Sequence, residues 1–311
     1  MEKAIFELLR QGFSFMDIKD KLSLSTEDMA LFLDNLNKGI HKRYNHIKFY
    51  ENGKRRYSFK EIPESGVITN TGSDYYKAVF IADTHFGSLD ASPKYLDIVY
   101  NFCIQNGIHN IYHLGDVIDG TSGMPSRKGC EPQEQVEFVI NKYPNDKSIL
   151  NFMLFGNHDL DIIGDIRNLH DAVMRNRKDM VCLGYGSNEF FLKNDSIVLK
   201  HKILIDKINN NINNKLIFKG HSHQMKVFDD LNNHLIFAPP LSDLQIIDGT
   251  IPGFLLVEFG FSNGYINKCV ITHYGILDDR LINMNVNRIN VNPHTKHEEI
   301  QREEVLVKIK K

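Results

Sequence analysis

Histidine, carboxylate and amide side chains recur in five short clusters along this chain of 311 residues. Their ring nitrogens and oxygens are donors that manganese, iron, zinc and nickel accept, whereas calcium and magnesium prefer cages made of oxygen alone. The expected chemistry is therefore that of a metal-binding site. The clusters are Asp83-Thr84-His85, Gly115-Asp116-Val117-Ile118-Asp119, Gly156-Asn157-His158-Asp159, His201 and Gly220-His221-Ser222-His223.

Short apolar runs typical of buried strands come directly before the clusters. The run Asn110–Leu114 ends at Gly115, and comparable runs cover 79–82, 152–155 and 216–219. Open α/β sheets bind their ligands beyond the carboxyl ends of the strands. We therefore expect four strand ends to bring these clusters to one rim.

Individual donors in the clusters have distinct expected roles. In an extended chain, residues two apart face the same side, so His221 and His223 could each reach one of two ions. Asn157 offers a neutral carbonyl oxygen, which limits the negative charge of the site. His201 follows an apolar run, as a ligand at a strand end would. His113 lies within a predicted strand, where a core histidine is expected.

The composition is that of an ordinary globular protein, with 42% hydrophobic and 24% charged residues and a net charge of -2. No apolar run approaches the roughly 18 residues that span a bilayer. The first six residues lack the pattern of a secretory signal, so we expect a cytoplasmic protein without a membrane partner. The sequence leaves the oligomeric state open. The four cysteines form no CxxC pair and are expected to be reduced thiols.

Residues 1–62 have a pattern of their own and predict a small separate domain. Apolar residues at helical spacing predict three short helices, the third opened by Ser25 and Asp28 in an acidic variant of a capping box. Asn52-Gly53 between two strand-like runs predicts a hairpin with a type I′ turn. Three helices and a hairpin resemble a winged helix-turn-helix module. A linker rich in turn-forming residues follows at 63–75.

The predicted hairpin is locally basic. Eight lysine and arginine residues lie between positions 38 and 60, against one acid, Glu51. Such a patch favours contact with phosphates, although the third helix carries acids that phosphates would repel. The alternative is a hairpin that packs on the catalytic domain or on a protein partner. The candidate nucleic-acid contacts are Lys48, Lys54, Arg55 and Arg56.

Taken together, the five clusters resemble the motifs DxH, GDxxD, GNHD, H and GHxH of the calcineurin-like metallophosphoesterase superfamily, in the same order. The resemblance covers about residues 77–274. It implies an α/β fold, a layered α-β-β-α sandwich, preceded here by the small winged-helix-like α+β domain. Helical runs at about 93–107 and 132–143 fit that alternation. We expect the catalytic domain at 76–277 and a polar C-terminal tail at 278–311.

The resemblance also implies a site for two divalent metal ions, with manganese expected and iron, zinc or nickel as alternatives. Asp116 would bridge both ions, and a water shared between them would lose a proton near neutral pH and attack phosphorus. The other ligands would be Asp83, His85 and His223 for the first ion, and Asn157, His201 and His221 for the second.

His158 stands next to a predicted ligand and has no metal assigned to it. We expect it to give the leaving oxygen a proton or a positive partner, with Asp119 orienting it as the second carboxylate of GDxxD does in the family. Asp159 is the alternative orienting group. Gly120 stands where the protein-phosphatase branch has an arginine, and without that guanidinium clamp a diester is favoured over a doubly charged monoester.

Three functions fit these features. The first is a dinuclear metal-dependent phosphodiesterase, with DNA or RNA as the substrate of a nuclease that resembles the double-strand-break repair nucleases and phage-type phosphoesterases of the superfamily. The second is a phosphodiesterase or phosphatase that acts on small nucleotides. The third is a non-catalytic DNA-binding sensor of a ligand. The complete ligand set favours the two enzymes over the sensor, which could lose ligands without harm.

Overall fold

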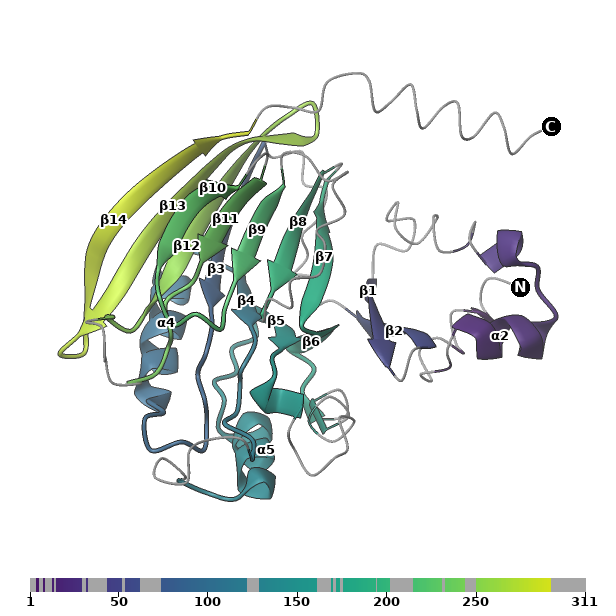
Figure 1. Cartoon of the computed structure of the whole chain (residues 1–311), viewed down its shortest axis with the longest axis horizontal. Helices are drawn as coiled ribbons and strands as arrows, with labels where there is room; N and C mark the ends of the chain where they lie inside the picture. Colours follow the sequence, from purple (N-terminus) through teal and green to yellow (C-terminus); the bar gives the residue numbers. More distant parts are fainter. Residues whose placement is uncertain are drawn as a thin grey trace.

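The structure of the protein is a computed structural model. Two β-sheets packed face to face form its larger part (Figure 1). The predicted mixed α/β sandwich is confirmed. Among the described residues, no helix is long and apolar enough to cross a bilayer. The described residues are 4–5, 8, 13, 15–29, 32, 44–51, 54–61, 74–121, 129–160, 169, 172–173, 176–193, 195–201, 215–230, 233–243 and 250–291.

The first sheet has seven strands. Four of them run parallel, as the predicted alternation of strands and helices requires, and three antiparallel strands extend one edge. In spatial order they are β14 (Arg280–Asn290), β13 (Tyr265–Leu277), β12 (Gly253–Ser262), β3 (Tyr75–Ile81), β4 (Asn110–Leu114), β5 (Leu150–Phe155) and β6 (Met180–Tyr185).

The second sheet has five strands. Its three inner strands are parallel, and an antiparallel strand pairs on either side. In spatial order they are β10 (Lys226–Asp230), β11 (Asn233–Phe237), β9 (Leu216–Lys219), β8 (Asp195–Lys200) and β7 (Ser187–Leu192).

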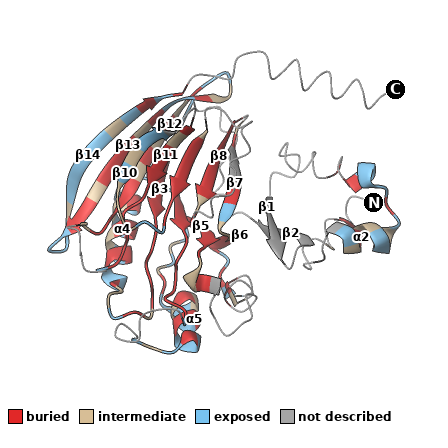
Figure 2. Cartoon of the chain, in the orientation of Figure 1, coloured by how far each residue is buried: buried red, intermediate tan, exposed pale blue. Residues whose placement is uncertain are grey.

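Stacked aromatic rings fill the space between the two sheets. The rings of Phe80, Tyr112 and Phe152 lie side by side with centroids 4.8 Å apart, and Phe218 of the second sheet stacks on Phe80 at 4.3 Å. Successive residues of a strand face opposite sides, so the neighbours of these residues pack on the helices instead. A strand covered on both faces must be apolar throughout, which explains the unbroken apolar runs in the sequence and the buried strands in Figure 2.

The helices α4 (Pro93–Gln105) and α5 (Pro132–Asn141) pack on the other face of the seven-stranded sheet and confirm the two predicted helices. In α4, Leu96, Val99 and Cys103 are buried, and their helical spacing gives one apolar stripe towards β3 and β4. A short 3-10 turn, His158–Leu160, directly follows β5 and Asn157. The two helices thus cover one face of the strands whose carboxyl ends carry the clusters.

The N-terminal region contains α2 (Phe15–Leu22) and the hairpin of β1 (Tyr44–Glu51) and β2 (Lys54–Glu61). The predicted hairpin is confirmed, with Glu51 paired to Lys54 across a two-residue loop. It lies beside β6 and β7 (Figure 1).

Ser25 and Asp28 bond each other's backbone N–H groups, so the predicted capping box is confirmed. The winged-helix assignment stays a prediction, and residues 63–73 of the linker lie outside the described residues. So do the side chains of Lys48, Lys54, Arg55 and Arg56.

The polar tail predicted at 278–311 is wrong for its first part, because 280–290 form β14. This strand pairs with β13 along its whole length. Alternating asparagines at 283, 285 and 287 suggest a loop in isolation, yet a strand with only one neighbour can leave such side chains in solvent. Residues 292–311 lie outside the described residues.

A buried ion pair joins the end of α5 to the start of β6. The Arg177 guanidinium contacts Asp179 at 2.7 and 2.9 Å and donates to the carbonyl oxygens of Val139, Tyr143 and Pro144. Both charged residues are buried. Removing one partner would leave the other charge without compensation in the interior.

We therefore predict that Arg177→Met lowers the free energy of unfolding by about 3–5 kcal/mol. The adjacent, exposed Lys178 provides a matched control, since Lys178→Met should change it by less than about 0.5 kcal/mol. Urea denaturation followed by circular dichroism measures both. Equal midpoints for the two variants would contradict the assigned role of the ion pair.

Candidate metal centre

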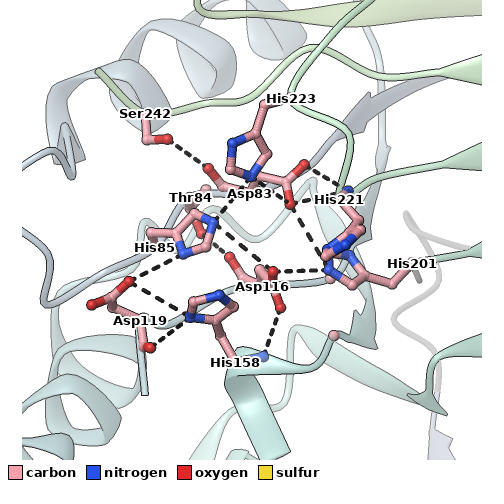
Figure 3. Close-up of polar contacts among 12 residues, drawn as sticks. Asp83, Thr84, His85, Asp116, Asp119, His158, His201, His221, His223 and Ser242 are labelled. Carbon is pink, nitrogen blue, oxygen red and sulfur yellow. Dashed lines mark hydrogen bonds and ion pairs between the residues drawn. The ribbon is translucent and has the colours of Figure 1, made fainter. Parts of the chain in front are cut away.

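The clusters predicted from the sequence meet at one rim, beyond the carboxyl ends of β3, β4, β5, β8 and β9 (Figure 3). Asp116 lies at the centre and is 1% exposed. Side chains from separate strands point towards it. Three compact groups of possible metal donors form here: Asp83, His85 and His223; Asp116, His201 and His221; and His85, Asp119 and His158.

The first group consists of Asp83, His85 and His223, whose donor atoms all lie within 4.8 Å of one another. The Nε2 atoms of the two histidines are 3.4 Å apart, and His223 Nε2 lies 3.5 Å from Asp83 Oδ1. Two imidazole nitrogens and a carboxylate oxygen that converge in this way can share one cation. This group coincides with the three ligands expected for the first ion.

The second group consists of Asp116, His201 and His221. His201 Nδ1 donates a hydrogen bond to the carbonyl oxygen of Leu114 at 2.7 Å, which directs Nε2 towards Asp116. A metal-binding histidine characteristically donates its other ring N–H in this manner. The structure thus brings His201 to the same place as the other predicted ligands.

Three buried donor atoms of the predicted second site have no hydrogen-bond partner among the described residues: Asp116 Oδ2, Asn157 Oδ1 and His201 Nε2. The first and third lie 2.8 Å apart and form an ion pair when His201 is protonated. A buried polar atom without a partner costs about 1–3 kcal/mol. A cation would satisfy all three atoms, so the residues present fit a metal site.

The two acids near His158 have different surroundings. His158 Nδ1 donates to the carbonyl oxygen of Asp119 at 2.8 Å, and Asp119 Oδ1 lies 3.3 Å from His85 Nδ1. Asp159 is instead held by the backbone N–H groups of Ile118 and Gly156, at 3.0 and 2.7 Å. Asp119 is therefore the acid beside both histidines, whereas Asp159 ties two loops together.

The packed charges shift the pKa values of the donors. Burial alone would raise the pKa of Asp83, but the hydrogen bond to His223 and the charge of His201 outweigh burial and lower that pKa. Burial opposes the charged form of His201 too, yet Asp116 and Asp83 raise its pKa to about 9. Burial and the charge of Asp116 raise the pKa of Asp159 to about 7. The rim is thus an electrostatically coupled unit.

His113 is a core histidine, as predicted. Gly115 N–H donates to its Nδ1 at 3.2 Å, so its own proton is on Nε2, 3.0 Å from the hydroxyl of Thr84. That hydroxyl donates to the carbonyl of Val117 at 2.8 Å. The chain of bonds joins the turn after β3 to the turn after β4.

The backbone at the rim is left-handed at most of the predicted ligands. This conformation is uncommon for residues other than glycine and concentrates at functional sites. It occurs at Asp83 (φ 54°), His85 (φ 45°), Asp116 (φ 52°), His221 (φ 70°) and His223 (φ 51°).

The expected extended chain at His221 and His223 is therefore wrong. The segment bends, and the bend sends the two side chains to different groups of donors. The predicted division of the two histidines between two ions remains compatible with this geometry.

Two glycines leave room for the ligands. A Cβ atom on Gly115 would lie 2.4 Å from His201 Nδ1, and one on Gly156 would lie 2.2 Å from Asp116 Oδ1. Both distances are shorter than any tolerable contact, so only glycine fits. The GD and GN motifs therefore require glycine before the ligand for a steric reason.

One contributor to the rim was not predicted from the sequence. The hydroxyl of Ser242 donates to the carbonyl oxygen of Asp83 at 2.9 Å and anchors the turn that carries it. Ser242 lies far along the chain from that turn and belongs to no motif, so only the tertiary structure reveals this contact.

The model of the calcineurin-like phosphoesterase family matches residues 76–240, more than half of the chain, and this protein therefore belongs to that family. No curated protein sequence matches the chain.

Solved structures similar to it include the phosphoesterase Yfce from E. coli, with 18% identity, a TM-score of 0.44 and coverage of 70% of this chain and 100% of that one. Vacuolar Protein Sorting 29 from Cryptosporidium parvum has 15% identity, a TM-score of 0.42 and coverage of 70% and 98%. An archaeal phosphodiesterase has 12% identity, a TM-score of 0.40 and coverage of 61% and 96%.

We predict that Gly156→Ala lowers the amount of metal bound to the purified protein, because the added methyl group displaces Asp116. Metal content after dialysis against manganese measures the effect. Gly260→Ala in β12 is the control, since its Cβ would meet no atom closer than 3.2 Å. Equal metal content in the two variants would contradict the steric argument.

Proposed function

We propose that this phosphoesterase hydrolyses phosphodiester bonds with the help of two divalent metal ions. The observation that carries the proposal is the convergence of two groups of donors on Asp116, with buried donor atoms that have no hydrogen-bond partner among the described residues. Membership of the calcineurin-like phosphoesterase family supports hydrolysis of a phosphate ester as the reaction.

The residues that would hold the ions are those of the first and second groups, with Asn157 added to the second. When bound, two divalent ions supply a deprotonated water at neutral pH and neutralise the charge of the phosphoryl oxygens. Manganese is the ion we propose, because a mixed set of imidazole, carboxylate and amide donors suits it; iron, zinc and nickel share that preference.

His158 is proposed to donate a proton to the leaving oxygen. Its Nδ1 donates to the carbonyl oxygen of Asp119, so the proton transfer is assigned to Nε2. The side chain is 21% exposed, which allows such an approach. As the new bond from water oxygen to phosphorus forms, the bond to the leaving group breaks and that oxygen takes the Nε2 proton. Asp119 would stabilise the protonated ring through its carbonyl oxygen and its carboxylate.

A diester is proposed as the substrate because the position after the GDxxD motif offers no guanidinium. Gly120 stands there, and its N–H group bonds Gln135 Oε1 at 2.8 Å. A polynucleotide is the finer form of this proposal. The basic sequence of the N-terminal hairpin supports it, since eight cationic side chains between positions 38 and 60 would attract a phosphate backbone.

For His158→Ala we predict a fall in turnover of roughly 10² to 10⁴, which is the usual contribution of a general acid. Metal content should stay at the wild-type level, because the ring is assigned to no metal. The exposed His109, which bonds a backbone carbonyl far from the rim, provides the control variant His109→Ala. Wild-type turnover in the His158 variant would remove this residue from the mechanism.

The proposed function is tested with bis-p-nitrophenyl phosphate, p-nitrophenyl phosphate, cyclic nucleotides, and single- and double-stranded DNA. Manganese-loaded protein should cleave the diesters in preference to the monoester, EDTA should abolish the activity, and added manganese should restore it. Asp116→Asn, which removes the carboxylate charge of the second group of donors, should be inactive. Activity that survives EDTA, or that is confined to the monoester, would overturn the proposal.

A further inference from the structure

Gln135 is a buried polar side chain that belongs to none of the sequence motifs. It lies on α5, is 1% exposed, and is buried together with Val136 and Val139 of the same helix. Its amide oxygen accepts a hydrogen bond from the Gly120 N–H group at 2.8 Å, and its amide nitrogen donates to the carbonyl oxygens of Gly120 and Cys130 at 3.3 and 3.1 Å. A buried amide whose oxygen and nitrogen are both bonded in this way is held in one orientation.

The Gly120 N–H group and the Asp119 carbonyl oxygen belong to one peptide unit. This unit is planar and trans, so its N–H and C=O bonds point in opposite directions. Gln135 Oε1 holds the N–H end, and His158 Nδ1 donates to the carbonyl end at 2.8 Å (Figure 3). Gln135 and His158 are therefore connected through a single rigid peptide.

A second hydrogen bond fixes the same peptide from its other side. The N–H group of Asp119 donates to the carbonyl oxygen of Phe86 at 2.9 Å. Two successive backbone N–H groups, those of Asp119 and Gly120, thus have fixed partners. The carbonyl group between them has its direction determined by these partners, and this is the group that His158 contacts.

The turn after β3 packs directly on the Gln135 side chain. A Cβ atom on Gly87 would lie 2.3 Å from Gln135 Cγ, so only glycine leaves room there. The Gly87 carbonyl oxygen accepts a hydrogen bond from the Cys130 N–H group at 3.1 Å, and the Cys130 carbonyl oxygen accepts one from Gln135. Gln135 thus joins the turn after β3, the turn after β4 and the start of α5.

The orientation of His158 matters for the proton transfer assigned to it. A ring whose Nδ1–H is bonded to a fixed carbonyl oxygen presents Nε2 in one direction. A proton donor that is misplaced by about 1 Å can lose roughly 10²-fold in rate. A group that fixes the carbonyl oxygen therefore contributes to catalysis without touching the substrate.

We propose that Gln135 is a positioning residue for the proton donor His158 and that it acts through the Asp119–Gly120 peptide. This inference rests on the proposed phosphodiesterase function, in which His158 protonates the leaving oxygen. It makes the contribution of Gln135 depend on the substrate, because a poor leaving group needs that proton more than a good one does.

The test compares two diesters with different aryl groups on the manganese-loaded, full-length protein. Diphenyl phosphate releases phenolate, which needs a proton more than the p-nitrophenolate released by bis-p-nitrophenyl phosphate. Gln135→Met keeps an unbranched side chain of similar size but loses all three hydrogen bonds. We expect the ratio of kcat for the nitrophenyl diester to kcat for the phenyl diester to rise roughly 10- to 100-fold, with wild-type metal content.

A double variant distinguishes positioning from a purely structural role. In the His158→Ala background, Gln135→Met should produce no further rise in the ratio, because the side chain that Gln135 positions is absent. A residue that only stabilises the fold would instead lower kcat for both diesters to the same extent in both backgrounds. That pattern, or an unchanged ratio in the single variant, would overturn the inference.

Gln133→Met in the same helix is the matched control and should keep the wild-type ratio. Gln133 is exposed and bonds Glu137 on the helix surface at 3.4 Å. Gly87→Ala displaces Gln135 by an independent route and keeps the inference falsifiable if Gln135→Met fails to fold. Its ratio should rise in the same direction.

The ratio measured for His158→Ala separates this inference from the proposed function. If the wild type cleaves both diesters and His158→Ala raises the ratio while Gln135→Met does not, the inference is overturned and the proposed function stands. If His158→Ala leaves the ratio unchanged, the proton-donor role and the inference both fail. If the wild type cleaves neither diester, the proposed function fails and the inference fails with it.

Discussion

The rest of the structure depends on one buried carboxylate, Asp116, held at the carboxyl end of a central strand. One of its oxygens accepts a hydrogen bond from the backbone N–H group of His158, and the other lies 2.8 Å from His201 Nε2. A buried charge is tolerated only when opposite charges and donors surround it. The histidines on both sides meet that need in the protein alone, and a pair of cations would meet it better.

The rim contains unfavourable backbone conformations, and the packing of the two sheets holds them in place. Left-handed residues and buried donors without hydrogen-bond partners each destabilise the folded chain locally. They persist because the strands beneath them are packed on both faces, by aromatic rings between the sheets and by α4 and α5 outside. Tethers such as the His113–Thr84 bond and the Ser242 hydroxyl transmit that rigidity to the turns.

Much of the fold could be predicted from local pattern, but not all of it. Strands covered on both faces, such as β4, are continuous apolar runs and were predicted. Strands β10 and β14 lie at sheet edges and mix polar with apolar residues, so their sequences resemble loops. Their identity depends on a neighbouring strand that supplies hydrogen bonds, and a local pattern contains no information about that neighbour.

The sequence by itself determined which donors are available and at which strand ends, because side-chain chemistry and apolar runs are local properties. Only the tertiary structure decided that Asp119, and not Asp159, lies beside His158, and that a bend divides His221 and His223 between two groups of donors. It alone placed Gln135 against the peptide whose carbonyl oxygen contacts His158. Such choices depend on the register and packing of segments far apart in the chain, which no single segment encodes.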